Sequence, residues 1–568
     1  MSTQAGPPPA GEPPAAGRPA PYPGQVTSGG GVTVNTRGVA VTGAGRNAAA
    51  ALIADGVPAG LAAKDPGLWG PGAAEEAAAR LGWLSAPRTS RSLLGGLGVL
   101  AAQAREDGLD HVVLAGTVGL SLAPETISRR AGMALTVLDS TDPHEVARIV
   151  RDRLENTLVV VSDKSGTTVE TESQRRIYER ALAGLGLSAQ QVARRFVIVT
   201  DPGSPLEKIA DEAGYHVVLA DPNVDARYTA LTAFGLAPAA LAGVDVARLL
   251  DEADELAAAL ASTPGNPGIA LGAALGGYAL AGHDKAVLAD CGSGLDGFGG
   301  WAEQLVAGST GKEGRGILPV AVEGEDAPGF SPGPDAHLIA LGDPARPADT
   351  VVSGPLGAQF LLWEYAVAVA ARLLGVSPFG QPGVAESAEN TRRLLAGAGG
   401  GPLPAGEPAF TDGAVDVHGD LDVISAAGDL AGLLDAVLWS LPESGYLAIM
   451  AYLDRAGDAE AQRLRGALAA RTTHPVTFGW APRLLHSAGQ YHKGGPPSGV
   501  FLQVTGALTE DVEVPGESYT LGRLQLAQAL GDLGALRRRG RPAIRLHLRD
   551  RPAGIAQLLA AASPEGVG

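Results

Sequence analysis

Five short apolar runs lie between residues 110 and 220, and longer amphipathic stretches separate them. The runs are HVVLA (111–115), LTVL (135–138), LVVV (158–161), FVIV (196–199) and HVVL (216–219). Continuous apolar strands that alternate with helices are typical of a parallel sheet covered on both faces. This part of the chain is therefore predicted to be a doubly wound α/β domain.

The same alternation returns later in the chain, after a helical stretch at residues 244–260. Strand-like runs recur in two groups, and a long helical insertion at 360–395 lies between them: 286–288, 317–320 and 338–340, then 447–449, 476–478 and 500–502. We therefore expect an α/β protein with two doubly wound parallel-sheet domains of similar design and additional helical arms. In such sheets a ligand binds beyond the carboxyl ends of the strands.

The expected organisation has five parts. The N-terminal residues are rich in Pro, Ala and Gly and cannot bury a core, which predicts a disordered tail. The parts are the tail 1–30, an N-terminal helical segment 31–95, a first α/β domain 96–245, a second α/β domain 246–552 that contains the helical insertion 360–395, and a C-terminal tail 553–568.

The composition of the 568 residues indicates a soluble globular protein. Hydrophobic residues make up 45% and charged residues 18%, so the chain has enough apolar surface to fold. The formal net charge of -18 disfavours nucleic acid and anionic membranes as partners. A single cysteine, Cys291, excludes an intramolecular disulfide and a Cys-only zinc site. With no secretory signal or membrane span expected, we predict a cytoplasmic location.

Two strand-to-helix turns are candidate ligand sites. The segment SDKSGTT (162–168) follows a buried strand and opens a helix, so its backbone N–H groups and hydroxyls could hold an anion. The alternative is simple N-capping by Ser165 or Thr167, with Glu170 closing a capping box. The segment GTVGLS (116–121) is a second turn that could face a ligand.

Two further segments carry polar side chains near glycines. WAEQLVAGSTGKEG (301–314) places Gln304 and Gly308 on one face of a helix. HSAGQYHKGGP (486–496) combines a lysine, two histidines and a glutamine with glycines that let a ligand approach the backbone.

These four segments, together with DARYTALTAFG (225–235), closely resemble glucose-6-phosphate isomerase of the type with two sugar-isomerase domains, in its high-GC bacterial branch. The resemblance runs from about Val32 to Leu548. It implies two flavodoxin-like domains, a homodimer with active sites near the subunit interface, no metal or cofactor, and isomerisation of an aldose and a ketose through a cis-enediol. The implied partner is a small-molecule substrate of carbohydrate metabolism.

The resemblance also implies roles for individual residues. Lys493 takes the place of the active-site lysine, Arg227 that of the arginine that stabilises the enediolate, and Gln304 that of a substrate-binding glutamine. The remaining expected substrate contacts are the phosphate-binding hydroxyls Ser165, Thr167 and Thr168, and the pocket positions Gly119, Leu120 and Gly308.

Several pocket positions depart from the pattern of the family. Asp163 replaces the first serine of the phosphate turn Ser-Lys-Ser-Gly-Thr-Thr, and Leu120 replaces the serine of a Gly-Gly-Ser turn. A carboxylate about 4 Å from a phosphate costs about 1 kcal/mol in water and ~4 kcal/mol at an effective dielectric of 20. Gly308 stands where the family carries its proton-abstracting glutamate, a kind of group that contributes ~10²–10⁴ in rate. Glu303 lies about 140° around the helix and cannot substitute.

These departures favour a repurposed pocket, in an isomerase-family enzyme that performs enolate or enediolate chemistry on a sugar-like or other polar carbonyl substrate, unphosphorylated or amine-bearing. Arg227 and Lys493 would stabilise the negative charge. Asp163 would be a new functional carboxylate, and His486 and His492 would be acid–base groups. The alternatives are that Asp163 caps its turn and that His492 packs beside Lys493 as a structural residue.

Two other functions stay open at this point. One is an ordinary glucose-6-phosphate isomerase, and the other is a non-catalytic sugar-binding paralogue. A gene position inside a biosynthetic cluster would favour new chemistry over central metabolism.

Overall fold

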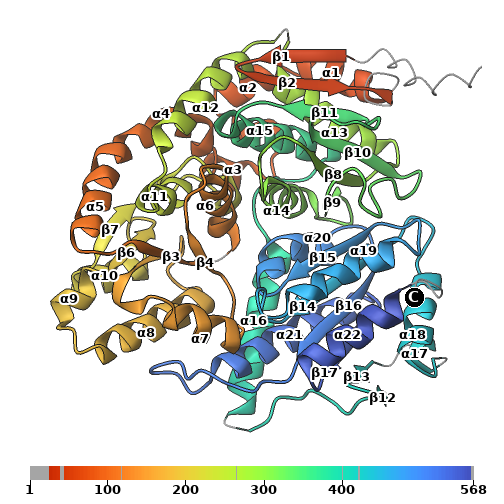
Figure 1. Ribbon diagram of the computed structural model, residues 1–568. Coiled ribbons are helices and arrows are strands. Elements are labelled where there is room, and N and C mark those ends of the chain that lie inside the picture. The colour runs from red at the N-terminus through yellow and green to blue at the C-terminus, as the bar shows by residue number, and fades with distance from the viewer. Residues whose placement is uncertain are drawn as a thin grey trace, which may run out of the picture.

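The computed structural model describes residues 25–38, 44–116, 118–263, 265–399, 401–419, 422–425 and 427–563. Within these residues the chain forms three mainly parallel sheets, each accompanied by helices (Figure 1). The α/β fold class is confirmed.

The first sheet contains the five apolar runs of residues 110–220, and all of its strand pairs are parallel. Alternate residues of the central strands enter two different hydrophobic clusters: Val112 and Leu114 join one, and Val113 and Ala115 join the other. Both faces are therefore buried, which explains the unbroken apolar runs. In spatial order the strands are β4 (Thr136–Leu138), β3 (His111–Gly116), β5 (Thr157–Ser162), β6 (Phe196–Thr200) and β7 (His216–Leu219).

The second and third sheets each contain four parallel strands and an antiparallel hairpin at one edge. The second sheet has the order β1 (Gln25–Gly29), β2 (Val32–Thr36), β11 (Thr350–Ser353), β10 (Ala336–Gly342), β8 (Lys285–Cys291) and β9 (Leu318–Val322). The third has the order β12 (Phe410–Asp412), β13 (Val415–His418), β17 (Ala543–Leu548), β16 (Gly499–Gly506), β14 (Tyr446–Tyr452) and β15 (Val476–Trp480).

The number of sheets differs from the prediction. The sequence assigned residues 246–552 to one domain, but these residues supply strands to two separate sheets. An apolar run shows that a strand is buried but does not show which sheet the strand joins. The two groups of similar runs were therefore assigned to one domain. The two sheets do share a hydrophobic cluster, to which Val287 and Val320 contribute from one sheet and Met450 and Phe501 from the other.

Both predicted tails include residues that are folded in the structure. Residues 25–29 form β1, which pairs with β2 across Gly30 and Gly31 at φ 55° and 75°. Two glycines between segments of alternating apolar and polar residues are typical of a β-hairpin. Here the surrounding stretch is also rich in glycine, so the pair did not stand out. The segment 31–95 therefore begins with a strand before its helices. At the other end, helix α22 (Arg551–Ala562) buries Ile555 and Leu558, although 553–568 was expected to be a tail. Residues 1–24 and 564–568 of the predicted tails lie outside the described residues.

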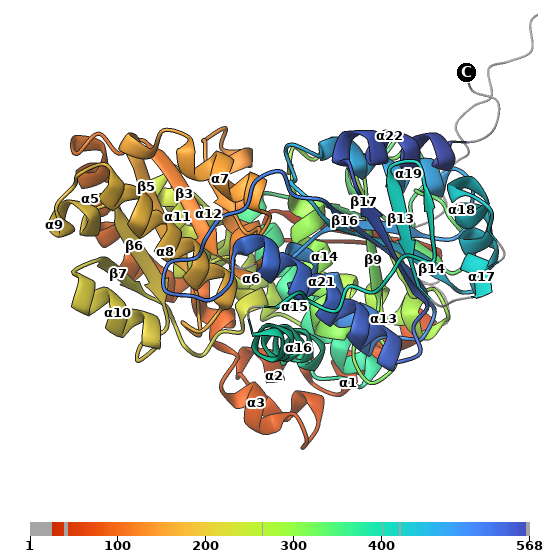
Figure 2. The same ribbon diagram turned by 90° about the horizontal axis from the view of Figure 1, so that it is seen from below.

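The helices surround the sheets and fill the space between them (Figures 1 and 2). Those up to the end of the first unit are α1 (Ala44–Ala54), α2 (Val57–Ala62), α3 (Ala74–Ala78), α4 (Ala86–Thr89), α5 (Leu94–Glu106), α6 (Val118–Arg130), α7 (Pro143–Arg151), α8 (Val169–Gly184), α9 (Ala189–Ala193), α10 (Pro205–Ala213) and α11 (Ala233–Leu241). The others are α12 (Val246–Leu260), α13 (Pro267–Leu280), α14 (Phe298–Thr310), α15 (Leu356–Leu374), α16 (Pro382–Ala398), α17 (Asp422–Ser425), α18 (Leu430–Trp439), α19 (Arg463–Ala469), α20 (Ala488–Gly494) and α21 (Leu521–Arg538).

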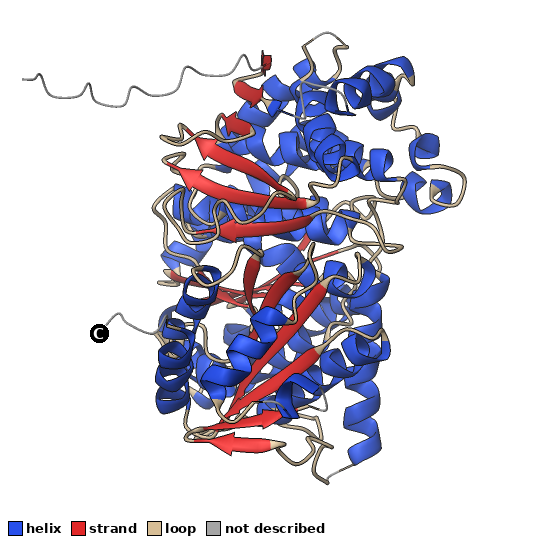
Figure 3. Ribbon diagram, turned by 90° about the vertical axis from the view of Figure 1, so that its right-hand side faces the viewer, coloured by secondary structure: helices blue, strands red, loops and turns tan. Residues whose placement is uncertain are grey.

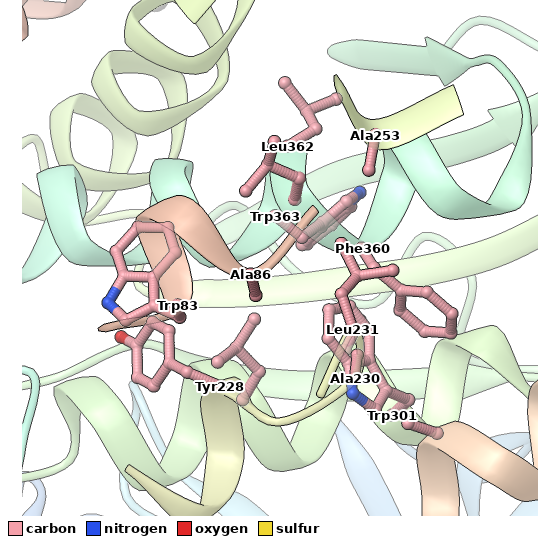
Figure 4. Packing of buried hydrophobic residues seen from close by; sticks show 14 of the residues in the cluster. Trp83, Ala86, Tyr228, Ala230, Leu231, Ala253, Trp301, Phe360, Leu362 and Trp363 are labelled. Carbon is pink, nitrogen blue, oxygen red and sulfur yellow. The ribbon is translucent and has the colours of Figure 1, made fainter. Parts of the chain in front are cut away.

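The largest hydrophobic cluster joins the first sheet to the helices of the second (Figure 4). Trp83 lies against Tyr228, and Trp301 and Phe360 pack edge to face with their ring centroids 4.7 Å apart. Because this cluster connects residues 32–379, the first two sheets are held by one continuous core. Figure 3 shows the strands of the second and third sheets (red) with helices packed around them. No helix among the described residues has the length and apolar character needed to cross a bilayer.

Candidate functional site

The predicted turns follow β3 and β5 at the centre of the first sheet. The chain leaves β3 toward β4 on one side, while β5 lies on the other side, so the strand order reverses at this point. Such a reversal opens a crevice beyond the carboxyl ends of the strands. Gly119 follows β3, and Ser165, Thr167 and Thr168 follow β5. The structure thus places both candidate turns beyond the strand ends at this reversal.

Asp163 caps its own turn. Its Oδ1 accepts hydrogen bonds from the backbone N–H and the hydroxyl of Ser165, both at 3.1 Å, and its Oδ2 accepts one from the Thr168 N–H at 2.9 Å. Both carboxylate oxygens are therefore engaged, and Asp163 itself is 4% exposed. The prediction of Asp163 as a free catalytic carboxylate is corrected to the alternative role of a cap. Helix α8 has no side-chain cap from Thr168, so the predicted Glu170 capping box does not form.

Gly308 and three other predicted residues come together between α6, α14 and the 3₁₀ turn η6 (Ala226–Tyr228). A Cβ added at Gly308 would lie 2.8 Å from Cδ of Arg227, and one added at Gly119 would lie 3.4 Å from Nε2 of Gln304. Position 308 therefore faces Arg227. In this chain the Arg227 side chain occupies the space into which a side chain at position 308 would extend.

Arg227 is held by a bidentate ion pair with Asp225. Nε lies 2.9 Å from Oδ1, Nη2 lies 3.1 Å from Oδ2, and Nη1 donates to the Ser309 hydroxyl at 3.3 Å. Burial acts to raise the pKa of Asp225, but the adjacent guanidinium outweighs it and lowers that pKa. Arg227 is therefore a fixed positive charge whose strongest interaction is with a carboxylate of the protein.

Lys493 is also paired inside the protein. Its Nζ lies 2.6 Å from Oδ1 of Asp532 on α21, and both side chains are 1% exposed. The Ser387 hydroxyl donates to the same carboxylate oxygen at 3.1 Å. Nearby, Gln490 accepts the Gly383 N–H at 2.8 Å and donates to the Gly311 carbonyl at 2.9 Å. These bonds tie α20 to α16, to α21 and to the end of α14.

Asp532→Asn is expected to lower the free energy of unfolding by about 3–5 kcal/mol, because it leaves the buried Lys493 ammonium without a counter-charge. Urea unfolding at neutral pH measures the change. Glu460→Gln is the matched control, since Glu460 pairs with Arg463 at the surface with side chains 67% and 71% exposed. The control should change stability by less than about 1 kcal/mol. Equal effects of the two variants would contradict the assigned role of Asp532.

His486 and Glu170 line a cavity of about 210 Å³, and the turn after β5 that resembles the phosphate turn of the family also lines it. His486 Nε2 lies 3.5 Å from Oε1 of Glu170, and Gln528 Nε2 donates to the same oxygen at 2.6 Å. Burial acts to raise the pKa of Glu170, but His486 and Gln528 together lower it below its usual range. Glu170 is thus a carboxylate at neutral pH. The hydroxyl-bearing residues Thr167 and Thr168 complete this wall of the cavity.

Two predicted site residues belong to the core instead. Leu120 is 2% exposed and packs in the largest hydrophobic cluster, so it is not a substrate contact. His492 is 3% exposed and lies against Phe501, with ring centroids 5.1 Å apart. Burial, helped by the positive charge of Lys493, lowers the pKa of His492 to about 3. His492 is therefore a neutral structural residue and not an acid–base group.

Glu303 does not reach the Gly308 site. It lines a different cavity of about 650 Å³, which lies between the second and third sheets and is called here the inter-sheet cavity. Burial raises the pKa of its carboxyl from 4.5 to about 7. Folding therefore favours the protonated form, and this contribution to stability is lost as pH rises from about 4.5 to about 7.

Glu303→Gln is expected to remove this loss, so that the free energy of unfolding of the variant falls less than that of the wild type between pH 5 and pH 7.5. Urea unfolding at both pH values measures the difference. The same slope in both proteins would show that Glu303 titrates normally.

Three residues that hold the candidate site together are not picked out as site residues by the sequence motifs. Asp225 bonds Arg227 and Asp532 bonds Lys493, while Gln528 bonds Glu170, which was considered only as a cap. Asp225 is two residues from Arg227 and could have been recognised as its partner. Asp532 and Gln528 lie on α21, far along the chain from every motif, and no local pattern could have indicated them. Among the described residues, no group of three or more His, Cys, Asp or Glu side chains is placed to hold a metal ion.

Comparisons with known proteins identify relatives of this chain. Residues 105–313 match the family model for phosphoglucose isomerase. A glucose-6-phosphate isomerase from Rubrobacter xylanophilus is 29% identical over 376 residues, which cover 53% of this chain and 86% of the relative. A protein named "Probable glucose-6-phosphate isomerase" from Haloarcula marismortui is 31% identical over 223 residues, which cover 38% of this chain and half of the relative.

Among solved structures, a glucose-6-phosphate isomerase from Chlamydia trachomatis is 19% identical, with a TM-score of 0.48 over 54% of this chain and 74% of that chain. The sequence matches include the segments around Gly119, Ser165, Arg227 and Gln304, all of which lie within the residues that fit the family model. Residues 105–313 are thus similar to phosphoglucose isomerase, and about half of the chain is similar to glucose-6-phosphate isomerases.

Proposed function

We propose that this chain is a sugar-isomerase-type enzyme in which His486, paired with Glu170, transfers the proton that the family moves with a group at position 308. One observation carries the proposal: the His486–Glu170 pair lines the same cavity as Thr167 and Thr168. Position 308 has no side chain, and Arg227 fills the neighbouring space.

The pair has the properties that proton transfer needs. A neutral imidazole can accept the proton from the carbon next to a carbonyl, and the electron pair moves onto the carbonyl oxygen to give an enediolate. The Glu170 carboxylate, 3.5 Å from Nε2, stabilises the imidazolium that forms. The proton of the neighbouring hydroxyl moves to the enediolate oxygen, and return of the first proton to the adjacent carbon completes the isomerisation without net oxidation. The imidazole Nδ1 is left for the substrate, while the Thr167 hydroxyl shares a hydrogen bond with the Ser165 hydroxyl at 2.9 Å.

The turn at residues 163–168, which resembles the phosphate turn of the family, favours a substrate without a phosphate. The N–H groups of Ser165 and Thr168 already donate to Asp163, so an incoming phosphate would have to displace a carboxylate of the protein. A phosphate held there would also be repelled by that carboxylate. We therefore propose an unphosphorylated, sugar-like carbonyl compound as the substrate. Arg227 and Lys493 are held as ion pairs with Asp225 and Asp532.

A homodimer in the cytoplasm is part of the same proposal, by resemblance to the family. Size-exclusion chromatography with light scattering tests the oligomeric state.

Solvent-deuterium exchange, followed by proton NMR, tests the function because it detects enolisation even without net isomerisation. The probes are D-fructose, D-glucosamine and D-fructose 6-phosphate. We expect the fastest exchange with an unphosphorylated probe. Faster exchange with D-fructose 6-phosphate would indicate an ordinary glucose-6-phosphate isomerase. Thermal stabilisation by a probe without exchange would indicate a sugar-binding paralogue. Either result would overturn the proposal.

A further inference from the structure

The inter-sheet cavity has the position of a ligand site in the second sheet. It is lined at the carboxyl ends of β8, β9 and β10, for example by Asp290, Glu323 and Leu341. The third sheet adds Arg455, which follows β14, and Trp480 at the end of β15. Two parallel sheets therefore present their carboxyl edges to one cavity. Its volume of about 650 Å³ falls in the range of ~300–1,000 Å³ that is common for small-molecule sites.

The topology of the second sheet supports this assignment. Strand β8 lies between β9 and β10, so the strand order reverses at β8 just as it reverses at β3 in the first sheet. Open α/β sheets bind ligands at such a reversal. In the first sheet this position holds the candidate active site, and in the second sheet it holds the inter-sheet cavity. The cavity shares none of its lining residues with the cavity of His486.

Charge at the cavity wall is balanced and rigidly held. The wall carries four arginines and five acidic side chains. At one end, Glu125 receives contacts from Arg129, Arg455 and Arg483 at 2.7–3.3 Å. These arginines lower the pKa of Glu125 to about 2, although burial acts to raise it. Since neither sign of charge prevails, the wall suits a neutral ligand that both donates and accepts hydrogen bonds.

Other parts of the wall fit the faces of such a ligand. Trp480 is partly exposed and packs edge to face with Phe478, with ring centroids 5.0 Å apart. An indole face held in this way can cover the apolar face of a sugar ring. Glu303 lines the cavity, where the backbone of Ala321 contacts its carboxyl. A Cβ added at Gly300 would meet no atom within 4 Å, which leaves this side open.

We propose that the inter-sheet cavity is a second binding site and that it takes a neutral sugar or polyol. Guanidinium groups would donate to its hydroxyls, Glu303 would accept from them, and Trp480 would cover an apolar face. This site is separate from the proposed active site and does not depend on the assignment of His486.

Titration with D-glucose, followed by tryptophan fluorescence and isothermal calorimetry, tests the proposal. Gly300→Leu places a side chain in the open space of the cavity and is expected to weaken D-glucose binding by roughly tenfold or more. Trp480→Ala should weaken binding by about two- to tenfold. The matched control is Gly397→Leu on α16, where an added Cβ also meets no atom within 4 Å but the residue lies outside the cavity. The control should bind D-glucose like the wild type.

Circular dichroism and thermal unfolding show whether the variants are folded, and Trp480→Ala keeps the test valid if Gly300→Leu is not. D-Glucose 6-phosphate is the charged probe, and it should bind this cavity no more tightly than D-glucose does. The proposal is overturned if D-glucose does not bind, or if both cavity variants bind it as tightly as the wild type. It is also overturned if D-glucose 6-phosphate binds more tightly than D-glucose and Gly300→Leu removes that binding.

Discussion

Gly308→Glu is expected to raise the rate at which D-fructose 6-phosphate is converted to D-glucose 6-phosphate by about 100-fold. This is the lower end of the ~10²–10⁴ that a positioned general base contributes. The lower end applies because a Cβ at position 308 would lie 2.8 Å from both Cδ of Arg227 and Nε2 of Gln381. Arg227 is fixed by Asp225 and must shift before the new carboxylate can reach the substrate. A coupled assay for glucose 6-phosphate measures the gain.

Gly308→Ala is the control for this experiment. It adds the Cβ and its crowding without a carboxylate, so it should lose stability and gain no activity. If wild type already converts D-fructose 6-phosphate at a rate that Gly308→Glu does not increase, the absent carboxylate is not the cause of a lower activity and the departure at 308 is neutral.

Asp163→Ser is expected to tighten binding of D-fructose 6-phosphate by between about fivefold and about 10³-fold. The limits correspond to removing a repulsion of about 1 kcal/mol in water or ~4 kcal/mol at an effective dielectric of 20, for charges about 4 Å apart. The substitution also releases the N–H groups of Ser165 and Thr168 for the phosphate. Isothermal calorimetry with D-fructose 6-phosphate and with D-fructose measures the change, which should be confined to the phosphorylated sugar.

Two further variants separate charge from capping. Asp163→Asn removes the charge while keeping an acceptor oxygen, and it should give part of the gain. Asp429→Ser alters a cap elsewhere, since Asp429 accepts the Gly432 N–H at 2.8 Å on α18, and it should leave sugar binding unchanged. An equal gain for D-fructose and D-fructose 6-phosphate in Asp163→Ser would contradict the electrostatic explanation.

The sequence predicted the parallel α/β architecture because both faces of the first sheet are buried. Val112 and Val113 enter different clusters, so the consecutive residues 112–115 of that strand are all apolar, and this pattern is local and readable. The division into three sheets depends on pairing between distant strands, such as β14 with β16, and no local pattern records it. The hairpin of β1 and β2 was readable in its Gly-Gly turn, yet it lay within a stretch rich in glycine.

The candidate site was predictable where a turn follows a strand, as at Ser165 and Thr168. Its electrostatics were not predictable, because the carboxylates that pair with Lys493 and His486 come from other parts of the fold. Asp532 lies 39 residues from Lys493, and Glu170 lies more than 300 residues from His486 in the sequence. Leu120 and His492 were misassigned because a motif shows the position of a residue in the chain and not the direction of its side chain.

The central claim, proton transfer by His486, is tested most directly by the rate of solvent-deuterium exchange into D-fructose in His486→Gln and wild-type protein. We expect the variant to lose ~10²–10⁴ of the wild-type rate while remaining folded. His474→Gln, which changes a histidine outside the cavity, should exchange at the wild-type rate. An undiminished exchange rate in His486→Gln would contradict the assignment of His486 as the proton-transfer group.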